Sequence, residues 1–186
     1  MQILLQLLIY HVIEYWKSFT DDFVFVAKHG KHALVDYGET LPIRSRFVEP
    51  DRLGGIANGL SYAGTFHFGK AFDYGIGVVD SHPEQIRQHY SVHCDDKNQI
   101  FRVEEKPAKA DTDLCGTGFY FFQRDVFDYI RKTPLPQRIG ELESTDFLQT
   151  LLNRYNPLRA VELDGVYFNV TTPDDLLKVR QTLNES

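Results

Sequence analysis

The sequence contains little cysteine, no concentration of positive charge and no long apolar run. The two cysteines, Cys94 and Cys115, lie far apart and lack the spacing of metal ligands. This excludes a disulfide framework and favours a reducing compartment, which we take to be the cytoplasm. Twenty Lys and Arg stand against 26 Asp and Glu, for a formal net charge of -6. Non-specific nucleic-acid binding needs a basic surface that replaces condensed counterions, so we expect no nucleic-acid partner.

The N-terminal segment is the most apolar part of the chain. Residues 1–13 lack the basic start and the small-residue cleavage site of a signal peptide, and they are too short to span a bilayer. Leu4, Leu8, Val12 and Tyr15 recur at spacings of three and four residues, which is typical of an amphipathic helix. We therefore expect a first helix that packs on the core, and no membrane partner.

Length and composition are those of one ordinary globular domain. The chain has 186 residues, of which 42% are apolar and 25% charged. This length suits a single domain over residues 1–186 with a sizeable core. We find no internal repeat, low-complexity segment or interdomain linker.

Helical and strand patterns alternate along the chain. Helices are expected over residues 4–18, 31–37 (closed by Gly38), 56–62 (opened by Gly54 and Gly55), 126–131, 144–152 (capped by Ser144) and 173–183 (capped by Thr172). Strands are expected over residues 23–27, 46–48, 74–79, 90–94, 100–104, 118–122, 158–163 and 166–170, with a hairpin turn at 95–98. This order predicts an α/β protein, a three-layer α/β/α sandwich with a mixed, mostly parallel sheet.

Two neighbouring segments, residues 102–107 and 116–122, predict a site for an anionic small molecule. Lys106 would hold a phosphate as a point charge, and Glu105 would accept hydrogen bonds from hydroxyl groups. Gly116 and Gly118 would let the backbone approach the ligand closely. The alternative for Lys106 and Glu105 is a solvated ion pair at a strand end.

Other charged and polar residues give weaker signals. Arg138 lies in a proline-containing loop, where it would bind phosphate or simply be exposed. Of the seven histidines, His29 and His32 are three residues apart, and His89 and His93 are four apart. Neither pair has a third ligand at a suitable spacing, so ordinary histidines are the better interpretation.

Six segments along the chain carry a combined signal. They are Gly55-Ile56-Ala57, Tyr90-Ser91-Val92, Glu104-Glu105-Lys106-Pro107, the strand from Gly116 to Phe121, Arg138 to Asp146, and Tyr167 to Leu176. In these segments and in their order, the chain resembles the sugar-phosphate nucleotidyltransferases, a family that includes glucose-1-phosphate thymidylyl- and uridylyltransferases. The resemblance covers nearly the whole length of the chain.

The resemblance implies a Rossmann-like nucleotide-diphospho-sugar transferase fold and a function. A nucleoside triphosphate and a hexose 1-phosphate, glucose 1-phosphate in the first place, would give a nucleoside diphosphate sugar and pyrophosphate. Lys106 and Arg138 are implied as the catalytic phosphate ligands. Sugar-binding residues would be Glu105, Tyr90, Ser91, Gly116, Gly118 and Tyr120. Gly55 and Glu49 would bind the nucleotide, and Asn169 would hold Mg²⁺, with Thr171 as the alternative oxygen ligand.

Two expected segments are absent. The family's opening strand and Gly-rich loop, whose backbone N–H groups would cradle the triphosphate, would precede Met1. The strand ending in a metal-binding Gly-Asp would lie near residues 64–65, and the chain contains no Gly-Asp. We therefore expect an active enzyme from whose sequence segments have been lost, a non-catalytic sugar-phosphate or nucleotide-sugar binder, or a truncated inactive form. Unpaired strand edges would favour pairing with a partner, and a homo-oligomer stays open.

Three positions depart from the family pattern. Asn169 stands where many relatives carry Asp, and the alternative for this residue is a backbone contact at a strand end. Glu49 stands near the position of a base-reading Gln, and a carboxylate accepts hydrogen bonds without donating any. Ser91 replaces a glycine beside the sugar. The resemblance consequently leaves the base and the sugar open.

Overall fold

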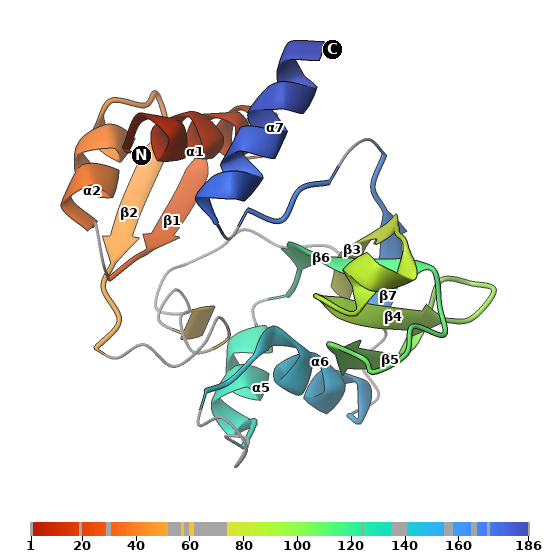
Figure 1. The fold of residues 1–186 in the computed structure, drawn as a ribbon. Coiled ribbons are helices and arrows are strands. Elements are labelled where there is room, and N and C mark those ends of the chain that lie inside the picture. Colours follow the sequence, from red (N-terminus) through yellow and green to blue (C-terminus); the bar gives the residue numbers. More distant parts are fainter. Residues whose placement is uncertain are drawn as a thin grey trace. The chain divides into compact units, whose positions relative to one another are not determined.

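The computed structural model describes residues 2–18, 20–28, 31–51, 57, 60–61, 74–123, 125–134, 141–154, 158–164, 167–170 and 172–185. The chain forms two compact units, one made of Met1–Asp51 and Phe168–Ser186 and the other of Arg52–Tyr167. Each unit has its own sheet (Figure 1). Within the described residues, every helix is too short or too polar to cross a bilayer. The single domain over residues 1–186 stays a prediction.

The described residues of the first unit form a small parallel sheet and three helices. Its elements are α1 (Gln2–Trp16), β1 (Asp22–Val26), α2 (Lys31–Glu39), β2 (Arg44–Val48) and α7 (Pro173–Glu185). Strands β1 and β2 pair in parallel from Asp22 opposite Arg44 to Val26 opposite Val48. The Phe25 and Phe47 rings stack with centroids 5.1 Å apart. The expected first helix and the two expected strands of this unit are confirmed.

One predicted helix end in this unit is confirmed, and another is wrong. Thr172 caps α7 as expected: its hydroxyl accepts the Asp175 N–H at 3.3 Å, and the Asp175 carboxylate accepts the Thr172 N–H at 2.9 Å. Gly38, in contrast, does not close α2, which runs on to Glu39. A Cβ on Gly38 would lie 2.5 Å from the Phe47 ring. The glycine is needed for packing against Phe47, and not as a helix terminator.

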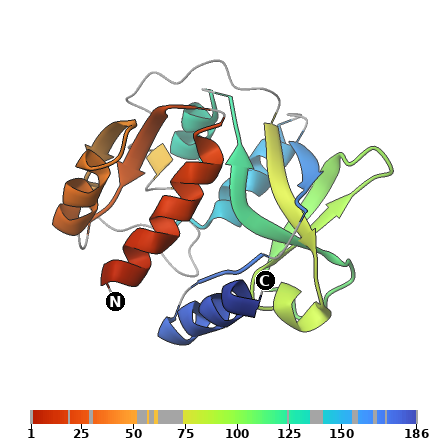
Figure 2. The same ribbon diagram turned by 90° about the horizontal axis from the view of Figure 1, so that it is seen from above.

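The second unit contains a five-stranded sheet in the order β5-β4-β6-β3-β7. Its elements are β3 (Tyr74–Asp80), α4 (Pro83–Ile86), β4 (Tyr90–Cys94), β5 (Ile100–Glu105), β6 (Leu114–Phe121), α5 (Val126–Lys132), α6 (Ser144–Leu152) and β7 (Leu158–Glu162). In Figure 2 the yellow β3 and the green β6 run side by side. The expected mixed sheet is confirmed. The expectation of mostly parallel pairing is wrong here, because β3–β7 is parallel while β3–β6, β4–β5 and β4–β6 are antiparallel.

The expected hairpin at residues 95–98 is confirmed, and its turn has a clear local cause. The Asp95 carboxylate accepts the N–H groups of Lys97 at 2.9 Å and of Gln99 at 2.8 Å. These two hydrogen bonds lower the pKa of Asp95. Asn98 has a φ of 59°, in the left-handed region that asparagine tolerates. The turn thus fixes β4 opposite β5, with Tyr90 opposite Glu105.

The core of the second unit lies between one face of its sheet and two helices. Ile76, Val78 and Val92 of the sheet are fully buried, in one cluster with side chains of α5 and α6. Phe147, Leu148 and Leu151 of α6 are also fully buried. Their spacing of one, three and four residues puts them on one helix face. This packing holds α6 against the sheet and positions the N-terminal end of α6 for the site described below.

Several bounds differ from those expected. Strand β6 begins at Leu114, before the expected Gly118, and α4 was not expected at all. The N-cap of α6 is Glu143, so Ser144 is its first helical residue and not its cap. Residues 167–170 form no strand. The expected helix over residues 56–62 lies largely outside the described residues.

Candidate functional site

Tyr90 of β4 lies across the strand that was expected to form the floor of a sugar pocket. Tyr90 is 6% exposed, and its hydroxyl donates to the Thr117 carbonyl at 2.8 Å. A Cβ added to Gly116 would lie only 1.9 Å from this ring. The close approach predicted for Gly116 is therefore made by the Tyr90 ring, a role for this glycine that sequence reasoning missed.

Gly118, two residues along β6, faces open space. No atom lies within 4 Å of the place where its Cβ would be. Its N–H donates to the Tyr167 hydroxyl at 3.3 Å. Beside it, Thr117 is buried, and its hydroxyl donates to the Gly77 carbonyl at 2.7 Å. Of the two glycines, Gly118 is the one beside which a ligand has room.

Tyr120 continues this cluster of hydroxyl groups toward α6. Its hydroxyl lies 3.5 Å from that of Tyr90 and also hydrogen-bonds with Ser144, which is buried at the start of α6. Burial is the largest cause that raises the pKa of both Tyr90 and Tyr120. Both phenols therefore stay neutral at physiological pH and can donate as well as accept hydrogen bonds.

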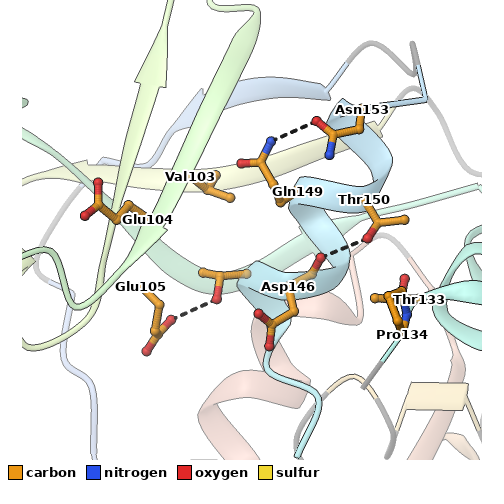
Figure 3. A pocket seen from close by; sticks show the side chains of 10 residues that line it. Val103, Glu104, Glu105, Thr133, Pro134, Asp146, Gln149, Thr150 and Asn153 are labelled. Carbon is orange, nitrogen blue, oxygen red and sulfur yellow. Dashed lines mark hydrogen bonds between the residues drawn. The ribbon is translucent and has the colours of Figure 1, made fainter. Parts of the chain in front are cut away.

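Glu105 ends β5 at the same side of the unit, and it is held in place by α6. Its Oε2 accepts a hydrogen bond from the Thr145 hydroxyl at 3.2 Å (Figure 3). Glu105 also lines an open cavity of about 560 Å³ between the end of β5 and α6 (Figure 3). The cavity is lined by Val103, Glu104, Glu105, Thr133, Pro134, Thr145, Asp146, Gln149, Thr150 and Asn153. These lining residues offer carboxylates, amides and hydroxyls, and neither Lys nor Arg is among the described ones, so the surface suits hydroxyl groups better than phosphate.

Lys106 follows directly, and its backbone is unusual. Its φ is 43°, in the left-handed region, although it is not a glycine. Its N–H donates to the His89 carbonyl at 2.7 Å. The ammonium lies 3.9 Å from Glu105 Oε1, and the side chain is 66% exposed. Lys106 is outside the described lining of the cavity. This position fits the solvated ion pair as well as an open phosphate site, so the phosphate role of Lys106 stays a prediction.

Ser91 is fully buried, with its hydroxyl 3.3 Å from Nε2 of His93. Its neighbour across β4–β5 is Glu104, and across β4–β6 it is Cys115. Any effect of Ser91 on sugar preference would therefore act through packing of the sheet. His93 also pairs with Asp111 at 3.4 Å, which accounts for this histidine without a metal.

The first unit holds a separate pocket of about 220 Å³ at the carboxyl ends of β1 and β2. It is lined by Phe25, Ala27, His32, Val35, Phe47, Val48 and Glu49. Lys28, just after β1, donates from its ammonium to the Pro50 carbonyl at 3.2 Å and also to that of Asp51. Lys28 thereby fixes the backbone directly after Glu49. Glu49, which was predicted to bind the nucleotide, thus lines a pocket. Gly55 lies outside the described residues.

The described residues form no acidic cluster that would mark a magnesium site. Asn169 is exposed, and nowhere in the described part of the chain do three or more His, Cys, Asp or Glu side chains gather in a way that could hold a metal ion. Arg138 and Thr171 lie outside the described residues. The metal role of Asn169 and the phosphate role of Arg138 stay predictions.

Thr145 and Ser144 are residues of the site that sequence reasoning missed. Both belong to the segment from Arg138 to Asp146 that resembles the family, but they read as an ordinary helix start. The signal that could have drawn attention to them is two adjacent hydroxyl residues at a helix N-terminus, next to a segment with a family resemblance. Their partners Tyr120 and Glu105 come from distant strands, so the sequence does not reveal the contacts.

Comparison with known proteins identifies the family. The model of the nucleotidyl transferase family matches residues 59–186. The chain is 25% identical to the bifunctional protein GlmU of Methanocaldococcus jannaschii, over 93% of this chain and 46% of that protein. It is 30% identical to a glucose-1-phosphate thymidylyltransferase of Streptomyces antibioticus, over 49% of this chain and 25% of that protein. The chain thus spans less than half the length of these curated relatives.

Solved structures show the same fold. A UDP-glucose pyrophosphorylase in complex with UDP-glucose has a TM-score of 0.82 at 14% identity, covering 98% of this chain and 86% of that one. A putative glucose-1-phosphate thymidylyltransferase from Bacillus anthracis has a TM-score of 0.76 at 20% identity, covering 95% and 82%. The expected Rossmann-like transferase fold is confirmed. Since the family model matches more than half of the chain, this protein belongs to the nucleotidyl transferase family.

Proposed function

We propose that this chain transfers a nucleotidyl group from a nucleoside triphosphate to a hexose 1-phosphate, glucose 1-phosphate in the first place. A phosphate oxygen of the sugar 1-phosphate attacks the α-phosphorus of the triphosphate. The bond from this phosphorus to the bridging oxygen breaks, pyrophosphate leaves, and a nucleoside diphosphate sugar forms. Such a reaction depends mainly on positioning and on neutralisation of charge.

The observation that carries the proposal is the arrangement around Tyr90. This residue is opposite Glu105 across β4–β5, and its hydroxyl binds the carbonyl of Thr117, directly before Gly118. A fixed carboxylate, two neutral phenols and an open strand position therefore border one region. Glu105 would accept hydrogen bonds from sugar hydroxyls, Tyr120 would donate or accept one, and the sugar would lie over Gly118.

The remaining roles extend this assignment. Lys106 and Arg138 bind the sugar phosphate, and Glu49 and Gly55 belong to the nucleotide site. We keep Mg²⁺ as the expected cofactor, with Asn169 as one oxygen ligand. The described residues contain no cluster of three or more His, Cys, Asp or Glu side chains for this ion. We place the reaction in the cytoplasm.

A pyrophosphate-release assay tests the proposal. The chain is incubated with Mg²⁺, glucose 1-phosphate and each nucleoside triphosphate in turn, and release is expected with at least one of them. Binding of glucose 1-phosphate is measured separately by calorimetry. Glu105→Gln should weaken this binding, while Glu162→Gln, on β7 and outside the cavity lining, is the matched control. Undiminished binding in Glu105→Gln would remove Glu105 from the sugar site.

A second candidate is a non-catalytic sugar-phosphate binder. It is favoured by the exposure of Lys106 and by the lack of an acidic metal cluster among the described residues. Binding of glucose 1-phosphate without pyrophosphate release would support this candidate. If neither binding nor release is observed, the remaining interpretation is an inactive form.

A further inference from the structure

The pocket of the first unit lies where parallel α/β sheets commonly bind ligands. Ala27 and Glu49 directly follow Val26 and Val48, the last residues of β1 and β2. Ligands of open α/β sheets bind in the crevice outside the carboxyl ends of the strands. The volume of about 220 Å³ is below the roughly 300–1,000 Å³ that is typical for drug-sized ligands. The pocket therefore suits one flat ring system, and not a whole nucleotide.

The pocket has apolar walls and two polar side chains. Phe25 and Phe47, stacked on each other, contribute aromatic wall, and Ala27, Val35 and Val48 contribute aliphatic wall. The polar side chains among the described lining residues are those of Glu49 and His32. A flat aromatic ring can bury its faces against such walls and present its edge to the carboxylate. A nucleobase is a ligand of this kind.

The Glu49 carboxylate would distinguish the bases by the hydrogen-bond donors and acceptors on their edges. It offers two acceptor oxygens and no donor. Guanine presents two adjacent donors, N1–H and N2–H, which match the two oxygens. Uracil and thymine present one N–H between two carbonyls, whose oxygens would face the carboxylate. Cytosine and adenine present one amino group beside a ring nitrogen acceptor, so each matches only one oxygen.

We propose that this pocket takes the guanine base of a nucleotide, with Glu49 accepting N1–H and N2–H, so that the nucleoside triphosphate is GTP. The inference rests on the proposed function, since it deepens the nucleotide site assumed there. Lys28 supports it by tethering the two carbonyls directly after Glu49 to the end of β1. The backbone that carries Glu49 is thus already fixed when the base binds.

Calorimetric titration of the full chain with GTP, ATP, CTP, UTP and dTTP, each without sugar phosphate, tests the inference. GTP should bind most tightly. A bidentate pair to a base edge discriminates by roughly five- to 150-fold. In Glu49→Gln the side-chain amide keeps one acceptor and gains a donor. The affinity for GTP should therefore fall by that factor, and the preference for GTP over UTP and dTTP should disappear. Glu39→Gln, at the exposed end of α2 and outside the pocket, is the matched control and should leave all affinities unchanged.

The outcomes separate this inference from the proposed function. Tighter binding of UTP or dTTP than of GTP, or an unchanged order of affinities in Glu49→Gln, overturns the guanine assignment and leaves the transferase proposal standing. GTP binding without release of pyrophosphate from GTP, whichever sugar phosphate is added, overturns the transferase activity and leaves the base assignment standing. Failure to bind any nucleotide overturns both.

Discussion

Lys106 combines a strained backbone with an exposed cation. A left-handed φ costs a non-glycine residue about 1–2 kcal/mol, and such strain often persists at functional sites. Lys106→Gly relieves it, so the free energy of unfolding should rise by up to about 1 kcal/mol in urea denaturation. Lys106→Ala keeps the strain.

Both variants should bind glucose 1-phosphate up to about fivefold more weakly, because an exposed ion pair contributes up to about 1 kcal/mol. Undiminished binding in Lys106→Ala would remove the phosphate assignment.

His89, whose carbonyl accepts the Lys106 N–H, reports on the same charge. Its pKa is lowered below the usual 6.5, first by burial and then by the positive charge of Lys106. As the pH falls below 6.5, the unfolded chain takes up this proton before the folded chain does. The contribution of His89 to stability is therefore fully present above pH 6.5 and is lost as the pH falls toward the folded pKa.

Removing the charge of Lys106 should shift this titration. In Lys106→Ala the pKa of His89 should rise, while remaining below 6.5 because burial, the larger cause, persists. NMR titration of the His89 ring measures the pKa directly. Lys109→Ala, a lysine beyond Pro107, is a control that should leave it unchanged. A His89 pKa that stays constant or falls in Lys106→Ala would contradict the charge effect.

Strand β6 carries two glycines that should respond oppositely to the same substitution. Gly116→Ala places a methyl group inside the Tyr90 ring and should cost about 1–3 kcal/mol of unfolding free energy. Gly118→Ala enters open space and should change the stability by less than about 0.5 kcal/mol. If the sugar lies over Gly118, this second variant should nevertheless weaken binding of glucose 1-phosphate. Equal destabilisation by both substitutions, measured by chemical denaturation, would contradict the geometry.

The elements show why sequence reasoning succeeds for some parts and fails for others. Helices α1 and α7 and the β4–β5 hairpin were predictable, because apolar spacing, the Thr172 cap and the Asp95 turn act locally. Helix α4 was missed because its four residues are too few to show a helical period. The strand pattern alone began β6 at Gly118, because glycine is a poor strand former, whereas the strand starts at Leu114 and Gly116 fits it beside the Tyr90 ring. Contacts such as Thr145 to Glu105 depend on the sheet order, which no local pattern encodes.

The two units should differ in their protection from hydrogen exchange. In β3 the residues Tyr74 to Val78 are all buried, whereas β1 and β2 contain no fully buried residue. Amides of β3 and β6 should therefore exchange more slowly than those of β1 and β2. Glucose 1-phosphate should slow exchange in β4–β6, and GTP should slow it at the ends of β1 and β2. Mass spectrometry of the intact chain before and after adding each ligand measures this, and ligand effects in the reverse units would contradict both site assignments.

The two margins of the five-stranded sheet meet at one point. Gln99, directly before the edge strand β5, bridges to Arg159 on β7, the opposite edge, and the Ala160 N–H donates to the Asn98 carbonyl at 2.8 Å. The rest of β5 carries Arg102 and Glu104, which pair with each other. A sheet whose edges meet, and an edge strand with charged side chains, both hinder pairing with a strand of another molecule. The five-stranded sheet therefore offers a foreign strand a poor template, while the backbone position of Gly118 stays open.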